Sequence, residues 1–214
     1  MPSHAEFLDT MGFREPVLES QEAFRTLLTA MAHPGRLVTF KTPGMIPRDL
    51  YAASWVVLLT LGDDSVRFWT DLPIDHEARW AVQSVTRVRT VSESREADLA
   101  LVTDPSGLSF PLDFPIGTEQ EPYLGATVII QVSSLCQWPS STSGEAFVLS
   151  GPGIQGRTAL RVRGCPKSFW DWRRSLEAVY PRGLDVLFTH DADLVAVPRS
   201  THVLPMGGLS CTSP

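Results

Sequence analysis

The sequence predicts one α/β domain in which helices cover both faces of a mixed β-sheet. Its 214 residues, 43% of them hydrophobic and 20% charged, are ordinary for one globular domain. Helical and strand-like patterns follow one another irregularly, which argues against a strict βαβ array. The stretch 126–132 is apolar on both faces, as a central strand of a covered sheet would be. We expect an arm at 1–15, the domain at 16–206 and a tail at 207–214.

The first predicted helix begins near residue 20, with Ser20 as its N-cap. Its apolar residues follow the spacing i, i+3, i+4, i+7, which places them on one stripe that we expect to face the core. They are Phe24, Leu27, Leu28 and Met31.

Three further helices are predicted at 48–61, 75–88 and 167–180. The helix at 48–61 is apolar nearly all round, so we expect it to be buried on most sides. Asp75 is the expected N-cap of the next helix. In the last helix, the residues predicted to face inward are Phe169, Trp172, Leu176 and Val179.

Strands are predicted where apolar and polar residues alternate, or where short apolar runs lie between turn residues. They are 65–70, 97–103, 126–132, 146–150, 158–163 and a hairpin within 183–203. Residues 104–122 contain four prolines, and a loop of this length is uncommon in a compact domain unless it has a role. The Ser-rich stretch 133–145 is predicted to be a surface connection.

Charge and cysteine content exclude several classes of protein. The net charge of −6 argues against nonspecific binding to nucleic acid, which needs a basic surface. Three widely spaced cysteines indicate neither a disulfide framework nor a zinc site, and they favour a cytoplasmic location. The N-terminal residues lack the basic and apolar regions of a signal peptide. The longest strongly apolar run, 55–61, is too short to cross a membrane.

The sequence GPGIQG at 151–156 has the glycine spacing of a dinucleotide-binding loop. Such a loop must lead into a helix. Here Thr158, Leu160 and Val162 alternate with the residues between them, as in a strand. We therefore expect a glycine-rich hairpin turn and no dinucleotide site.

Arginine outnumbers lysine by 16 to 2, and three arginines share one side of the strand after this turn. They are Arg157, Arg161 and Arg163. Two interpretations remain open. The three side chains bind a phosphate or an acidic partner subunit, or they are charges on a solvated face that protect a sheet edge.

Trp170 lies about 200° from Trp172 on an ideal helix, and therefore off the predicted inward stripe. It is close to Arg173 along the chain. Tryptophan beside arginine on a surface is typical of interfaces, so Trp170 and Arg173 are candidates for partner contact. The alternative is that Trp170 is an incidental, partly covered side chain.

The predicted hairpin ends in Pro198-Arg199-Ser200-Thr201-His202. Arg199 and Thr201 are two residues apart on an extended chain, so their side chains lean the same way. A fixed guanidinium beside a hydroxyl suits a phosphate, a phosphonate or a partner's carboxylate. The alternative is an internal pair between Arg199 and Asp185.

No local pattern indicates catalysis or metal binding. The five histidines form neither H-x-H nor H-E-x-x-H, and neither a nucleophile elbow nor a Walker A sequence occurs. The two lysines, Lys41 and Lys167, lie in no persuasive loop for a Schiff base with pyridoxal phosphate. We expect no catalytic residue, no metal and no cofactor in this chain.

Several stretches together resemble one family, PhnH, the H subunit of the bacterial carbon–phosphorus lyase system. The most specific is the hairpin, which begins with Tyr-Pro-x-Gly-x-Asp and ends with Pro-Arg-x-Thr. The resembling stretches are SQEAFRTLLTAMAHPG (20–35), SWVVLLTL (54–61), FPIGTEQEPYLGATVIIQVSSL (114–135), LSGPGI (149–154) and YPRGLDVLFTHDADLVAVPRSTHV (180–203).

The resemblance implies an α/β fold similar to that of pyridoxal-phosphate-dependent transferases, without the cofactor. It also implies a homodimer that joins the G, I and J subunits in a core complex. That complex takes part in transferring a phosphonate to the ribose of ATP with release of adenine. No catalytic residue of the family is secure enough to assign here, so we expect an accessory subunit.

Two functions remain open from the sequence. One is a non-catalytic subunit that supports the synthesis of ribose 1-methylphosphonate 5-triphosphate within the complex. The other is a binding protein for a phosphonate or a nucleotide, with Arg199 and Thr201 as donors.

Overall fold

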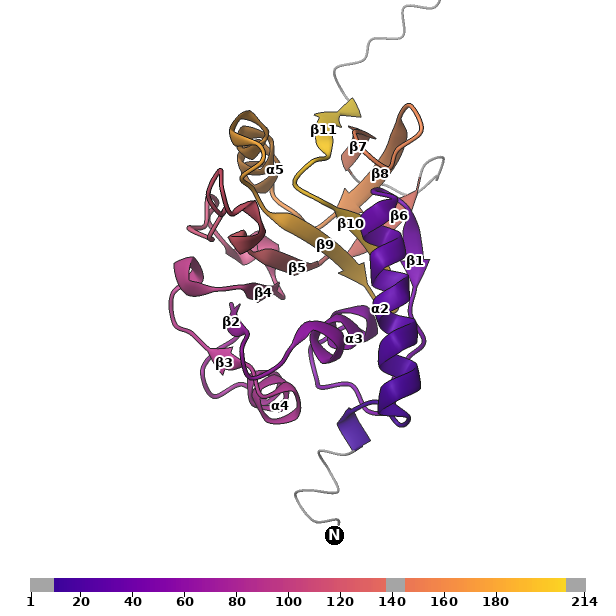
Figure 1. The fold of residues 1–214 in the computed structure, drawn as a ribbon, viewed down its shortest axis with the longest axis vertical. Coiled ribbons are helices and arrows are strands. Elements are labelled where there is room, and N and C mark those ends of the chain that lie inside the picture. The colour runs from indigo at the N-terminus through magenta and orange to yellow at the C-terminus, as the bar shows by residue number, and fades with distance from the viewer. Residues whose placement is uncertain (1–9, 138–144, 207–214) are drawn as a thin grey trace, which may run out of the picture.

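The protein is built in three layers, with a seven-stranded sheet in the middle (Figure 1). The structure is a computed structural model, and it describes residues 10–137 and 145–206. Helices cover one face of the central sheet, while a second, smaller sheet and another helix cover the other face. The mixed α/β class and the helices on both faces are confirmed.

The central sheet has the strand order β1-β10-β9-β5-β4-β2-β3. Five neighbouring strands are parallel, β10 runs antiparallel beside β9, and β1 pairs antiparallel with β10. The bounds are β1 Leu37–Thr39, β2 Arg67–Thr70, β3 Arg89–Thr90, β4 Leu99–Val102, β5 Thr127–Gln131, β9 Asp185–His190 and β10 Asp193–Val197. The all-buried patterns of β4 and the hydrophobic part of β5 fit strands that are covered on both faces.

Three helices cover the first face of this sheet: α2 Pro16–Ala32, α3 Ala52–Leu61 and α4 Glu77–Thr86. The expectation for α3 is confirmed, because every residue from Ala52 to Leu58 is buried. The N-cap of α4 is His76, whose side chain accepts from the N–H of Ala78, rather than Asp75. The helix begins at Glu77, so His76 directly precedes it and its side chain can accept from one of the N–H groups that have no partner within the helix.

The second face is covered by an antiparallel sheet of order β11-β7-β8-β6 and by α5. The bounds are β6 Ser134–Gln137, β7 Glu145–Ser150, β8 Thr158–Arg163, β11 His202–Pro205 and α5 Lys167–Ser175, which continues as a 3-10 turn to Val179. The predicted hairpin turn at 151–156 is confirmed, because β7 and β8 pair antiparallel on either side of it. The sequence did not predict this separate sheet, since β6 lies inside a stretch taken for a surface connection.

The prediction for the first helix is wrong in two respects. It begins at Pro16, so Ser20 lies inside it and not at its N-cap. It also faces the sheet with Ala23, Leu27 and Ala30, and it leaves Phe24 and Leu28 exposed. Small alanines allow the helix to approach the sheet closely, and this rotates the larger apolar side chains outward.

The N-terminal arm and the C-terminal tail fall largely outside the described ranges, as do residues 138–144. The boundaries at 15 and 207 stay predictions. Within residues 10–137 and 145–206, no helix has the length and apolar character needed to span a membrane.

Candidate functional site

Arg199 and Asp185 lie together at the amino end of the parallel strands. Asp185 is the first residue of β9, and Arg199 follows the antiparallel partner strand β10. The Asp185 carboxylate accepts from the backbone N–H of Arg199 at 2.9 Å and from its Nη2 at 2.6 Å. The two side chains are only 14% and 15% exposed. Of the two arrangements that the sequence left open for Arg199, the structure has the internal pair.

The remainder of the Arg199 guanidinium bonds to the loop before β5. Its Nη1 donates to the carbonyl of Pro122, and its Nη2 lies 3.4 Å from the carbonyl of Gly125. A Cβ at position 125 would lie 2.8 Å from Arg199 Nη1 and 2.3 Å from the carbonyl oxygen of Gly183. Arg199 therefore ties the end of the proline-rich loop to the hairpin, and glycine at 125 leaves room for it.

Arg173, from α5, holds the same exit segment from inside the protein. Its Nη2 donates to the carbonyls of Pro198 at 2.8 Å and Thr201 at 3.1 Å, and the residue is 2% exposed. Burial lowers the pKa of Arg173, and the charges of Glu177 and Asp185 oppose this shift.

Thr201 is fully buried, and its hydroxyl has no hydrogen-bond partner among the described residues. A surface ligand cannot reach a side chain in this position. Arg199 and Thr201 therefore do not form the expected pair of donors for one ligand. Arg199 is in an ion pair, and Thr201 lies inside the core.

A shallow hollow of about 350 Å³ opens over the Arg199–Asp185 pair. Its rim includes Tyr123 and Tyr180, which are 71% and 61% exposed, and Ser200 also lines it. This is the place where a ligand or a partner would approach Arg199. The guanidinium there already bonds to a carboxylate and to backbone carbonyls.

The three arginines of the predicted basic strand lie in and before β8. This strand is flanked by β7 and β6, so it is not a sheet edge, and the edge-protection part of the alternative interpretation is wrong. Leu160 and Val162 face the core, which leaves Arg161 and Arg163 on the opposite face of the small sheet. Arg157 is exposed just before the strand. Their role in binding stays a prediction.

Trp170 and Arg173 do not lie on the surface, so the expected interface position is wrong. Both are 2% exposed, and the ring of Trp170 stacks on Phe147 with centroids 3.8 Å apart. The buried face of α5 carries Phe169, Trp170 and Arg173, while Trp172 is half-buried. Arg173 follows Phe169 by four residues, so helical spacing alone would have placed it on the inward face.

The carboxyl ends of β2 and β4 form the position where open α/β sheets commonly bind ligands, because the chain connections diverge there. Here a side chain of the protein fills it. Asp71 follows β2, and its carboxylate accepts from the backbone and hydroxyl of Thr103 at 2.8 and 3.0 Å and from the N–H of Asp104 at 2.9 Å. No local pattern in the sequence indicates this contact, which joins two loops 32 residues apart along the chain.

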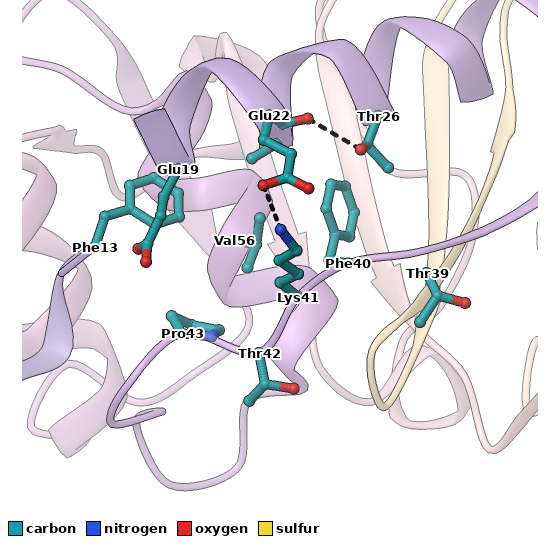
Figure 2. A pocket seen from close by; sticks show the side chains of 11 residues that line it. Phe13, Glu19, Glu22, Thr26, Thr39, Phe40, Lys41, Thr42, Pro43 and Val56 are labelled. Atoms are coloured by element: carbon teal, nitrogen blue, oxygen red, sulfur yellow. Dashed lines mark hydrogen bonds and ion pairs between the residues drawn. The ribbon is translucent and has the colours of Figure 1, made fainter. Parts of the chain in front are cut away.

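A separate pocket of about 190 Å³ lies between α2 and the loop that follows β1. Figure 2 shows Lys41 from this loop reaching Glu22 on α2, at a distance of 2.7 Å. The other lysine, Lys167, pairs with Asp171 within α5 at 2.5 Å. Both lysine side chains are about four-fifths exposed, at 80% and 79%, so neither occupies the buried position typical of a lysine that forms a Schiff base.

Comparison with known proteins relates the chain to phosphonate metabolism. A protein of Rhizobium meliloti named alpha-D-ribose 1-methylphosphonate 5-triphosphate synthase subunit PhnH is 27% identical over 89% of this chain and 92% of its own length. A protein of Stutzerimonas stutzeri named putative C-P lyase subunit protein HtxG is 29% identical over 86% of this chain and 85% of its own. The sequence model of PhnH, described as a bacterial phosphonate metabolism protein, matches residues 11–204. The chain therefore belongs to the PhnH family.

Proposed function

We propose that this chain is an accessory, non-catalytic subunit of the carbon–phosphorus lyase core complex. There it supports transfer of a phosphonate to the ribose of ATP with release of adenine. The printed names of the two relatives, a synthase subunit and a putative C-P lyase subunit, support this role.

The observation that carries the accessory role is that the protein's own groups fill both ends of the parallel strands. At the amino end, Arg199 is paired with Asp185. At the carboxyl end, Asp71 is bonded to the backbone of Thr103 and Asp104. General acid–base or electrostatic catalysis needs a group that can reach the substrate, and these groups already have partners inside the chain.

The proposed partners are a second copy of this chain and the G, I and J subunits, in the cytoplasm. The proposed fold relationship is to pyridoxal-phosphate-dependent transferases, without the cofactor. The exposed, ion-paired positions of Lys41 and Lys167 support the absence of a Schiff base. We expect borohydride treatment after incubation with pyridoxal phosphate to label neither lysine preferentially. A stoichiometric adduct on one of them, found by peptide mass spectrometry, would contradict this.

The alternative, a phosphonate or nucleotide site at Arg199 and Thr201, has less support. The hollow over Arg199 favours it, whereas the ion pair with Asp185 and the burial of Thr201 disfavour it. Calorimetric titration of ATP and of methylphosphonate into the isolated chain separates the two functions. We expect no heat of binding from either ligand.

Reconstitution tests the accessory role directly. The G, I and J subunits are expressed with and without this chain, and adenine release from ATP plus methylphosphonate is measured by chromatography. We expect adenine release from the four-subunit preparation, much less without this chain, and none from this chain alone. Adenine release by the isolated chain would refute a non-catalytic role, and equal release without it would refute a role in the complex.

A further inference from the structure

The hollow over the Arg199–Asp185 pair offers few donors to an anion. Nε and Nη2 of Arg199 donate to the Asp185 carboxylate, so its positive charge already has a counterion. Nη1 and Nη2 also donate to the backbone carbonyls of Pro122 and Gly125. The prolines that line the hollow add no N–H donor of their own. They are Pro122, Pro181 and Pro198.

The exposed side chains of the same hollow favour a cation instead. Tyr123 and Tyr180 line it with most of their surface exposed. The Tyr123 hydroxyl donates to Glu121 Oε1 at 2.8 Å, which places a carboxylate at the tip of this ring, and Glu119 is exposed on the same loop. Arg182 is close by in the chain but does not line the hollow. An aromatic face and a neighbouring carboxylate both attract a cation, and the planar guanidinium of an arginine also stacks on such a face.

We propose that this hollow receives an arginine of a partner subunit, whose guanidinium stacks on an exposed tyrosine ring and pairs with the Glu121 carboxylate. The assignment rests on the accessory role proposed above, and it names the surface and the chemistry of one contact in the complex. It also reverses the sign of the charge expected from the sequence, which assigned the exit at Arg199 to a phosphate, a phosphonate or a carboxylate.

A different protein fits this hollow better than a small molecule or a second copy of the chain. Sites for small molecules enclose most of the ligand, whereas this hollow is shallow. Leu124 follows Tyr123 and is 49% exposed, and tyrosine beside an exposed apolar side chain is typical of protein interfaces. A two-fold contact between two copies would set the same surface against itself. The acidic side chains of Glu119 and Glu121 from both copies would then repel one another.

Paired tyrosine variants test the stacking, with biolayer interferometry measuring the affinity of the full chain for the purified G, I and J subunits. Tyr123→Leu combined with Tyr180→Leu keeps apolar side chains but removes both ring faces, so we expect the affinity to fall by about tenfold or more. Tyr123→Phe combined with Tyr180→Phe keeps both faces and should lose less than about threefold. Equal melting temperatures will show that the variants fold. An equal loss in both double variants, or no loss in the leucine variant, would overturn the assignment.

Charge reversal tests the sign of the partner's charge. Glu121→Arg should weaken binding by about tenfold or more, because the new cation repels the partner's arginine. Asp75→Arg is the matched control, since Asp75 is exposed beyond the carboxyl end of β2, at the other end of the strands, and it should change nothing. Tighter binding by Glu121→Arg would indicate an acidic partner and overturn the assignment.

Photo-crosslinking identifies the occupant. Leu124→p-benzoylphenylalanine in the assembled complex should cross-link to another subunit, within a few residues of an arginine. Replacement of that arginine by glutamine should reproduce the loss seen with the leucine variant and add little to it in combination. A cross-link to a second copy of this chain, or to a segment without arginine, would overturn this surface and leave the accessory role standing. A wild-type chain that binds none of the other subunits would overturn both.

Discussion

Two arginine–aspartate pairs occupy the amino end of the central sheet, and they share one geometry. In each, an aspartate at or just before the start of a parallel strand accepts from the backbone N–H of its arginine at 2.9 Å and from the guanidinium at 2.6 Å. The pairs are Arg67–Asp98 and Arg199–Asp185. Their surroundings differ: the first pair is 51% and 40% exposed, and the second is 14% and 15% exposed.

The difference teaches that burial and additional partners, more than the geometry of the pair, decide how much an ion pair contributes to stability. Water competes for Arg67 and Asp98, so their attraction is screened and adds little to stability. Arg199 also donates to the carbonyls of Pro122 and Gly125, which fixes the proline-rich loop. Removal of one member of a buried pair leaves the other without a compensating charge, and this is costly.

The largest expected effect is that of Arg199→Ala. It leaves Asp185 buried without its cation and frees two carbonyls, so we expect the free energy of unfolding to fall by about 3–5 kcal/mol. Urea denaturation measures it, with Arg67→Ala as the matched control at less than about 1 kcal/mol. Retained stability together with lost complex assembly would instead assign Arg199 to partner or ligand binding.

A smaller effect is expected from Gly125→Ala. The new Cβ would lie 2.3 Å from the carbonyl oxygen of Gly183 and 2.8 Å from Arg199 Nη1, so the loop must move away from the guanidinium. We expect a loss of about 1–3 kcal/mol in thermal or urea unfolding. Gly107→Ala is the control, because its Cβ would meet only the end of the Asp104 side chain, at 3.1 Å. Equal stability of the two variants would show that position 125 is not constrained by Arg199.

The smallest effect is expected at Asp98. Hydrogen bonds from Arg67 hold the pKa of Asp98 below its ordinary value, although partial burial opposes this. A depressed pKa stabilises the fold above the unfolded value of about 3.9, and this contribution is lost as pH falls through the lower folded pKa. Asp98→Asn should therefore cost less than about 1 kcal/mol near pH 7, and this cost should shrink as the pH falls below the unfolded value. A difference that persists in acid would mean that the pair acts through packing instead of charge.

The sequence by itself determined the α/β class, most of the helices and strands, and the hairpin turn at 151–156. These follow from local periodicity and turn chemistry, which act within a few residues and so can be read along the chain. The stretches that resemble PhnH were also enough to indicate the family, and the match of the family model confirms it.

Only the tertiary structure decided which side of each helix is buried and which charged groups meet. Phe24 and Leu28 fit the spacing of a buried helical face as well as Ala23 and Ala30 do. The helix lies close to the sheet, and the alanines are the residues buried there. Arg173 was expected at an interface beside Trp170, yet it is buried and donates to two backbone carbonyls. The sequence allowed Arg199 to face outward or to pair with Asp185. The antiparallel pairing of β9 and β10 brings the two residues together. The physical reason is the same in all three: the free energy of a side chain depends on neighbours that are distant along the chain, and periodicity carries no information about them.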